Sequence, residues 1–190
     1  WKSEGVDVSA VHVHKDAPTG VYFVRHDADG HHFSYLRKGS AASGMRPEDL
    51  SPALIGNTKY LHVTGISQAI SVTASRTVAA AIAMARSAGA RVSYDPNLRS
   101  ALWSLEDARS VVIETIASAD EFLPGFEELS KLSGLHKAED LIAWAHQQGT
   151  KVVVMKNAIH IGLRMPPRRP KALATPAPRI RQAVGKGSDR

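Results

Sequence analysis

Short apolar runs alternate with amphipathic stretches through the middle of the chain, from about residue 58 to residue 156. The apolar runs are typical of buried strands, and they lie at 59–66, 90–95, 120–123 and 151–156. The stretches between them predict helices at 71–87, 104–119, 125–133 and 138–148. Strands that alternate with helices indicate βαβ units. We therefore expect an α/β domain with a parallel-rich sheet, doubly wound or nearly so.

A β-hairpin is predicted ahead of this domain, over residues 19–37 (TGVYFVRHDADGHHFSYLR). Asp29-Gly30 lies between two runs rich in Val, Tyr and Phe, which is a typical hairpin signal. Tyr35 and Arg37 are two residues apart, so they share one face of the second strand. Together with Tyr22 they suit either a lid over a binding site or the solvated face of a small sheet.

Five residues that can bind metals gather around the hairpin turn: His26, Asp27, Asp29, His31 and His32. Imidazole and carboxylate groups are metal ligands. An exposed turn offers them no fixed scaffold, so we favour a solvated turn over a metal site.

The stretch VSYDPNLRSALW, residues 92–103, ends a strand with polar residues. Ligands of open parallel sheets bind at the carboxyl ends of strands. Pro96 stops the strand, Asn97 offers a donor and an acceptor, and Arg99 presents a planar fork for carboxylate or phosphate. A turn with a surface arginine explains the same residues. No Walker or Rossmann phosphate-binding motif is present.

Composition places the chain among globular proteins. It has 190 residues, of which 43% are hydrophobic, and no cysteine. No apolar run approaches the ~20 residues of a membrane span. These features fit a cytoplasmic protein without membrane association. The chain begins Trp1-Lys2-Ser3-Glu4, with neither a signal peptide nor an initiating methionine, so we expect a fragment or a truncated gene product.

The net charge of +6 is concentrated in the last segment. Residues 158–190 carry eight basic and one acidic residue (+7), so residues 1–157 carry −1. This segment is rich in Pro and Arg, and we expect it to be disordered or translated out of frame. It has no aromatic residue on which bases could stack, so we disfavour nucleic-acid binding. The predicted organisation is a lid segment (1–46), an α/β core (47–157) and a basic tail (158–190).

Three stretches carry a family resemblance: TGVYFVRHDADGHHFSYLRKGSAAS, YLHVTGISQAIS and RVSYDPNLRSALW. Occurring together and in order, they resemble the 2-keto-3-deoxygluconate kinase branch of the ribokinase-like (PfkB) sugar kinases, from about residue 1 to 156. The resemblance implies a ribokinase-like three-layer sandwich with a small β-lid, here truncated at both ends. It also implies transfer of the γ-phosphoryl group of ATP, with Mg²⁺, to 2-keto-3-deoxygluconate, giving the 6-phosphate.

The resemblance also implies roles for particular residues. Tyr22, Tyr35 and Arg37 match lid positions that hold the sugar acid. Arg99 matches the arginine that meets the substrate near the strand end. Asn97, together with Arg99, matches the nucleotide side of the site. An anionic sugar acid suits this reading, because Arg37 and Arg99 supply two guanidinium groups from two elements.

Glu128, in LPGFEE, resembles the glutamate of the family's Asn-x-x-Glu motif, which is associated with Mg²⁺ and phosphate. Here Gly125 stands where asparagine is usual. The Gly-rich amino-terminal segment and the Gly-Ala-Gly-Asp motif, which holds the general base, do not occur in the sequence. No catalytic residue is therefore assigned, and we expect this chain alone to be nearly inactive.

Alternative functions remain open beside the 2-keto-3-deoxygluconate kinase. One is a non-catalytic remnant that still binds sugar acids. Another is a different sugar kinase of the same family, such as a fructokinase. In the family the lid often mediates dimer contacts, so the resemblance also implies a possible lid-mediated homodimer.

Overall fold

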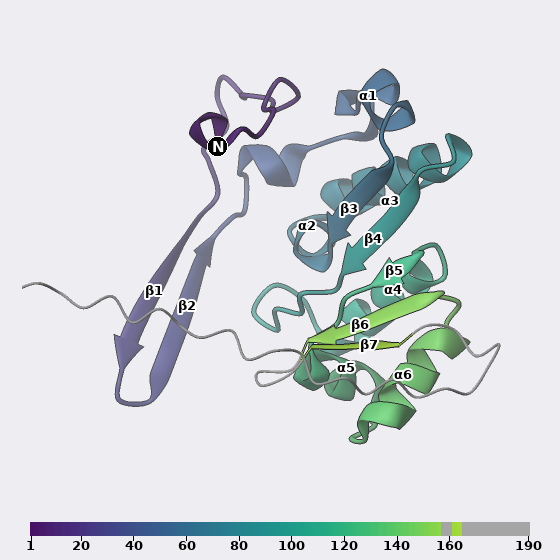
Figure 1. The fold of residues 1–190 in the computed structure, drawn as a ribbon. Coiled ribbons are helices and arrows are strands. Elements are labelled where there is room, and N and C mark those ends of the chain that lie inside the picture. The colour runs from purple at the N-terminus through teal and green to yellow at the C-terminus, as the bar shows by residue number, and fades with distance from the viewer. Residues whose placement is uncertain (157–160, 165–190) are drawn as a thin grey trace, which may run out of the picture.

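The computed structural model describes residues 1–156 and 161–164. It has two parts, a projecting β-hairpin and an α/β body (Figure 1). The hairpin consists of β1 (Val21–Asp27) and β2 (Gly30–Leu36). The body is built on a sheet with the strand order β3-β4-β5-β6-β7. Its strands are β3 (Tyr60–Thr64), β4 (Arg91–Asp95), β5 (Glu121–Phe122), β6 (Val152–Lys156) and β7 (Ile161–Arg164).

The first four strands of the sheet are parallel, as the sequence predicts, and β7 runs antiparallel to β6. β7 falls inside the segment for which we expected no regular structure. The remainder of that prediction concerns residues 157–160 and 165–190, which lie outside the described residues.

The four longer helices lie where the periodicity predicts them, within a few residues. They are α3 (Val72–Ser87), α4 (Leu105–Ile116), α5 (Phe126–Ser133) and α6 (Ala138–Gln147). Two single-turn helices were not predicted, α1 (Pro52–Gly56) and α2 (Gly65–Ala69). Short 3₁₀ turns complete the described helices, at Lys2–Glu4, Ala41–Gly44 and Pro47–Asp49. Among the described residues, no helix has the length and apolar character needed to cross a bilayer.

Sequential strand order places the helices on one face of the sheet. Each right-handed crossover from β3 to β6 moves in the same direction. In Figure 1, α3 and α4 lie behind the strands, and α5 and α6 lie below β6 and β7. The sheet contributes one set of buried side chains to the core: Val92, Tyr94, Phe122, Val153 and Met155. The helices contribute the facing set, among them Val78, Ile82, Val112, Ile116, Leu129, Leu132 and Leu141.

The opposite face of the sheet carries polar side chains that satisfy one another. Arg91 pairs with Glu121 at 2.8 Å and donates a hydrogen bond of 2.7 Å to the Tyr60 hydroxyl. His62 Nδ1 lies 3.2 Å from Ser93 Oγ. The second helical layer of a ribokinase-like sandwich has no counterpart over residues 1–156 and 161–164. The face on which that layer would pack is polar over β4 and β5, and β6 adds the half-buried Val152 and Val154 to it.

Two side chains fix the ends of elements. Ser71 Oγ accepts a 2.9 Å hydrogen bond from the Ala74 amide, which starts α3, and donates one of 2.6 Å to the Ser43 carbonyl. Asp120 accepts hydrogen bonds of 3.0 Å from the Val92 amide and from Lys151 Nζ. Burial opposes ionisation of Asp120, but these hydrogen bonds and the nearby positive charges outweigh it and lower its pKa.

Candidate functional site

The hairpin gathers aromatic and basic side chains on one face. Tyr22 lies opposite Tyr35 in the β1–β2 register, with ring centroids 6.3 Å apart. Phe33 extends the cluster, 6.3 Å from both tyrosine rings. The Arg37 guanidinium lies over the Tyr35 ring, 5.4 Å from its centroid. The prediction that Tyr35 and Arg37 share a face is therefore confirmed.

Arg37 has an unused donor. It is half-buried, and its Nε is shielded from solvent without a hydrogen-bond partner among the described residues. Its aliphatic stem packs closely against the start of the hairpin, because a Cβ on Gly20 would lie 3.5 Å from Arg37 Cγ. A guanidinium held in one place over an aromatic ring matches a carboxylate or phosphate in geometry and charge, so this position suits an anionic partner.

The loop after β4 is held in a defined conformation. The Asn97 amide donates a 3.0 Å hydrogen bond to Asp95 Oδ1, and Asn97 has φ 38°, in the left-handed region. Pro96 and Leu98 are buried and anchor the loop. Asn97 is half-buried, whereas Arg99 is exposed and donates a 3.2 Å hydrogen bond to the Leu98 carbonyl. The loop therefore presents an amide and a guanidinium at the carboxyl end of β4.

The first residue of α2 lies against this loop. Gly65, which directly follows β3, is buried, and a Cβ at this position would lie 2.9 Å from the Pro96 carbonyl carbon and closer still to its oxygen. Only glycine fits such an approach. The backbone at the start of α2 thus supports the Pro96–Arg99 loop.

Glu128 caps the helix that follows β5. Its Oε2 accepts a 2.8 Å hydrogen bond from the Gly125 amide. A Cβ on residue 125 would lie only 3.1 Å from this oxygen, so the glycine makes room for the folded-back carboxylate.

Sequence reasoning missed one pair of residues at the strand ends. Lys156, the last residue of β6, donates a 2.5 Å hydrogen bond from Nζ to Asp95 Oδ2. The Lys156 amide also donates to the Pro124 carbonyl at 2.7 Å. The signal available in the sequence was an acid directly before a Pro-Asn turn, which is typical of a side chain that caps the turn.

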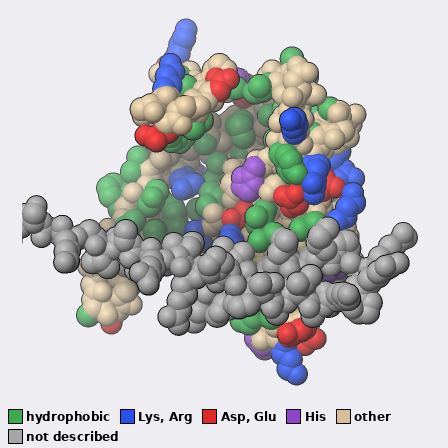
Figure 2. All heavy atoms as spheres, in the orientation of Figure 1, with side chains coloured by type: hydrophobic (Ala, Val, Ile, Leu, Met, Phe, Trp, Pro, Cys, Tyr) green, Lys and Arg blue, Asp and Glu red, His purple; other side chains and the backbone are tan. Residues whose placement is uncertain are grey.

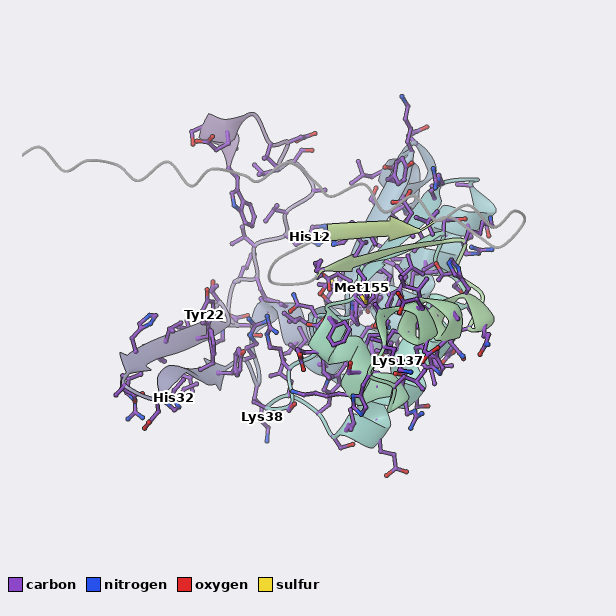
Figure 3. All side chains as sticks on the ribbon, turned by 60° about the horizontal axis from the view of Figure 1, so that its bottom comes forward. His12, Tyr22, His32, Lys38, Lys137 and Met155 are labelled. Carbon is purple, nitrogen blue, oxygen red and sulfur yellow. The ribbon has the colours of Figure 1, made fainter. Side chains whose placement is uncertain are left out.

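The hairpin and the strand ends face the same side of the molecule. In Figure 1 the arrowheads of β3 and β4 point toward the side where the hairpin lies. Figure 3 shows Tyr22 near the base of the hairpin and His32 toward its tip. Figure 2 shows a hollow between the hairpin and the body, with Lys or Arg side chains visible inside it. Among the described residues, no hydrogen bond or ion pair joins Tyr22, Tyr35 or Arg37 to the strand-end residues.

The residues present give a metal ion few protein ligands. The described part of the chain contains no group of three or more His, Cys, Asp or Glu side chains that could hold a metal. At the hairpin turn, Asp27 instead pairs with Arg25 at 3.0 Å and with His32 at 3.1 Å. Mg²⁺ at kinase sites usually needs only one or two carboxylates, because phosphates and waters complete its shell. Glu128 is the carboxylate predicted for this role, and its Oε2 accepts the hydrogen bond of the Gly125 amide.

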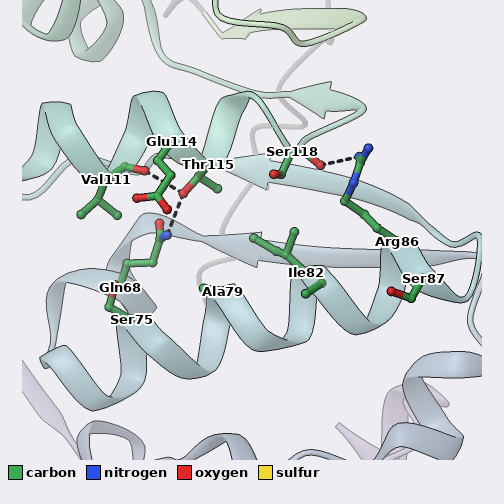
Figure 4. A pocket seen from close by; sticks show the side chains of 11 residues that line it. Gln68, Ser75, Ala79, Ile82, Arg86, Ser87, Val111, Glu114, Thr115 and Ser118 are labelled. Atoms are coloured by element: carbon green, nitrogen blue, oxygen red, sulfur yellow. Dashed lines mark hydrogen bonds between the residues drawn. The ribbon is translucent and has the colours of Figure 1, made fainter.

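A separate groove lies between α3 and α4, lined in part by Gln68, Arg86 and Glu114 (Figure 4). Its volume is about 450 Å³. At its floor the Tyr94 hydroxyl donates to Gln68 Oε1 at 2.9 Å, and Gln68 Nε2 donates to Thr115 Oγ1 at 2.8 Å. Burial raises the pKa of Tyr94 far above its usual value. None of the predicted site residues lines this groove, so it supports the fold rather than the site.

A parallel α/β body whose strand ends face an aromatic hairpin agrees with the class of ribokinase-like sugar kinases. A protein-family model described as "pfkB family carbohydrate kinase" matches residues 1–158. The chain belongs to this family. A 2-dehydro-3-deoxygluconokinase of Thermoproteus tenax is 33% identical over 165 residues, 82% of this chain and 48% of the relative. A fructokinase-2 of Solanum lycopersicum is 35% identical over 141 residues, 73% of this chain and 43% of the relative.

Solved structures agree with the fold. A PfkB protein from Polaromonas sp. JS666 is 36% identical with a TM-score of 0.78, over 84% of this chain and 54% of that one. A fructokinase from Vibrio cholerae O395, solved in its fructose-, ADP- and calcium-bound form, is 26% identical with a TM-score of 0.74, over 87% and 54%. The ribokinase-like α/β class is thereby confirmed. The chain spans about half the length of the curated relatives it matches.

Proposed function

We propose that this chain forms the sugar-acid-binding and nucleotide-binding part of a carbohydrate kinase. The reaction it serves transfers the γ-phosphoryl group of ATP to 2-keto-3-deoxygluconate and gives the 6-phosphate. Family membership and the relatives named 2-dehydro-3-deoxygluconokinase support this reaction class. The observation that carries the choice of an acidic sugar is Arg37, half-buried and held over the Tyr35 ring.

Each hairpin residue recognises a different part of the sugar acid. Arg37 pairs with the carboxylate of the sugar, because a guanidinium matches a carboxylate in geometry and charge. Tyr22 and Tyr35 offer ring surface to the carbon chain and hydroxyl groups to its oxygens. Their ring packing fixes the face that they present, so little side-chain freedom is lost on binding.

The strand-end residues hold the nucleotide and the transferred group. Asn97 contacts the nucleotide, and Arg99 lies between nucleotide and substrate, where its positive charge stabilises the phosphoryl group in transfer. Glu128 is one carboxylate for Mg²⁺, which when bound neutralises charge on the phosphates. We assign no general base to a residue of this chain.

Binding measurements test the role of Arg37 without requiring turnover. A charge-assisted hydrogen bond contributes about 1.5–3 kcal/mol, so we expect Arg37→Ala to weaken 2-keto-3-deoxygluconate binding by roughly 10- to 150-fold in calorimetry. The matched control is Lys38→Ala, which removes a positive charge from the exposed neighbouring residue and should bind as the unmodified chain does. Equal affinities of the two variants would contradict the proposal.

Turnover is tested by coupled ADP release with 2-keto-3-deoxygluconate, ATP and Mg²⁺, beside Arg99→Ala. Turnover that Arg99→Ala abolishes would assign phosphoryl transfer to this chain. Binding of the sugar acid without turnover would support a chain that binds but does not catalyse alone.

A second candidate substrate is fructose, because fructokinases share up to 35% identity with this chain. Fructose has no carboxylate, so Arg37→Ala should leave its affinity unchanged. Fructose binding tighter than that of 2-keto-3-deoxygluconate would favour this alternative.

We also propose that two copies of the chain associate through their hairpins. Phe23 and Leu36 are 59% and 65% exposed, and both lie on the face opposite Tyr22. Burial of such side chains favours association. Sedimentation velocity should show a dimer that Phe23→Ser converts to monomer. A monomer at all concentrations would contradict this proposal.

A further inference from the structure

We infer that Asp95 and Lys156 form a clamp that fixes the Pro96–Arg99 loop, which makes both of them positioning residues for nucleotide binding. This inference rests on the proposed function, because it concerns how the same strand-end site is held. Neither residue is expected to touch the substrate itself. They act through Asn97 and Arg99.

The clamp spans three strands. Asp95 ends β4 and Lys156 ends β6, with β5 between them in the sheet. Next-but-one strands lie roughly 9–10 Å apart, so a lysine must extend across the intervening strand to reach a carboxylate. It can do so here because β5 ends at Phe122. The 2.5 Å contact of Lys156 Nζ with Asp95 Oδ2 therefore ties the outer two strand ends together.

Both oxygens of Asp95 are in use. Oδ2 accepts from Lys156, and Oδ1 accepts the 3.0 Å hydrogen bond from the Asn97 amide. The Asp95 side chain is only 20% exposed, against 44% for Lys156. A carboxylate at that depth needs its partners more than a fully exposed one does. Loss of the lysine leaves the carboxylate free to turn away from the loop.

The loop needs external support because of Asn97. Its φ of 38° lies in the left-handed region, which disfavours residues other than glycine, although Asn tolerates it best. Such a conformation persists only where surrounding contacts hold it. The Asp95–Asn97 hydrogen bond is the contact that acts on the backbone of this residue, and Lys156 orients the carboxylate that makes it.

The far end of β6 provides a matched control. Lys151, directly before β6, pairs with Asp120 at 3.0 Å and gives a second lysine–aspartate pair at the amino end of the strand, away from the loop. Lys151→Met and Lys156→Met remove the same chemical group from the two ends of this segment. Only the second change loosens the clamp.

The test compares Mg·ATP affinity by calorimetry for five variants of the full chain: Lys156→Met, Asp95→Asn, the double variant of these two, Asp95→Ala and Lys151→Met. Asn at position 95 still accepts the Asn97 amide but loses the ion pair. We expect Lys156→Met and Asp95→Asn each to weaken binding about three- to tenfold. The double variant should match the single ones, Asp95→Ala should be weaker still, and Lys151→Met should bind as the unmodified chain does. Additive losses in the double variant, or equal affinities of Lys156→Met and Lys151→Met, would overturn the clamp.

Hydrogen exchange separates the clamp from the proposed function. If the unmodified chain does not bind Mg·ATP, the proposed nucleotide role fails, and the clamp is judged by the exchange of the Asn97 amide alone. We expect faster exchange at Asn97 in Lys156→Met than in Lys151→Met, and faster still in Asp95→Ala. Equal exchange in all three variants would overturn the clamp whatever the binding result.

Discussion

The closest backbone approach in the candidate site predicts a large effect from a single methyl group. Replacing Gly65 by alanine would put a Cβ 2.9 Å from the carbonyl carbon of Pro96 and 3.2 Å from its Cα. Carbon atoms pack at about 3.5–4.0 Å, so the start of α2 and the Pro96 loop must separate by at least roughly 0.6 Å. Both are backbone segments of a buried sheet end, so neither can rotate away as a side chain would.

The size of the effect follows from this displacement. Overpacking a well-packed site costs about 1–3 kcal/mol, and each kcal/mol lowers Tm by roughly 2–4 °C in a chain of this length. We expect Gly65→Ala to melt about 2–12 °C below the unmodified chain, measured by circular dichroism. Because the displaced loop carries Asn97 and Arg99, Mg·ATP affinity should fall as well.

Gly56→Ala is the matched control for this prediction. Gly56 ends α1, lies outside the left-handed region, and a Cβ there would meet nothing within 4 Å. The same added methyl group should leave Tm unchanged or raise it, since alanine loses less backbone entropy on folding. If both variants melt at the same temperature, the loop does not rest against Gly65 as described and the reasoning is wrong.

Three further changes test the supports of the body. Ser71→Ala removes both the cap of α3 and a hydrogen bond to a neighbouring turn, so thermal melting should show that the free energy of unfolding falls by about 1–2 kcal/mol. Ser51→Ala, which removes one exposed 3.3 Å cap bond, should lower it by less. Equal losses in the two variants would contradict this. The lowered pKa of Asp120 means that its stabilisation is present above the unfolded-state value of about 3.9 and is lost as pH falls through the folded value. Urea unfolding should therefore show that Asp120→Asn is less stable than the unmodified chain at pH ~7 but not at pH ~2. If the difference in stability between the two chains did not depend on pH, Asp120 would not be the source of this stabilisation. Tyr94→Phe should cost about 1 kcal/mol near neutrality by leaving Gln68 without its donor. Because burial raises the Tyr94 pKa, only the unmodified chain should lose stability from this group above pH ~10, and parallel pH profiles would contradict that.

Periodicity located most of the body because buried strands and amphipathic helices differ strongly in their pattern. It failed for α2, a single turn that starts under the Thr64 side chain and the Pro96 loop, where tertiary contact decides the conformation. β7 was missed because its four residues show no pattern of their own and pair with β6 in the antiparallel direction.

The candidate site was predictable only where one short segment carries it. Asn97 and Arg99 could be proposed because Pro96 marks the end of an apolar strand. The hairpin face was found because cross-strand periodicity fixes which side chains are neighbours. The contact between Asp95 and Lys156 joins residues 61 positions apart and depends on sheet order, which no local pattern specifies. Likewise, the cap that Glu128 places on Gly125 depends on the absence of a side chain at position 125.

The way the hairpin is attached determines how far each of its residues would move if the hairpin rotated as a unit about its base. Every β1 residue has a partner in β2, and the Ala41 amide bonds the Pro18 carbonyl at 2.9 Å across the base. A strand of this length extends roughly 24 Å, so a rotation of ten degrees about the base would sweep the tip through about 4 Å. Tyr22, Tyr35 and Arg37 lie close to the axis and would move only a fraction of that. Such a rotation would therefore move the tip of the hairpin while it hardly changed the distance between the aromatic face and the strand ends.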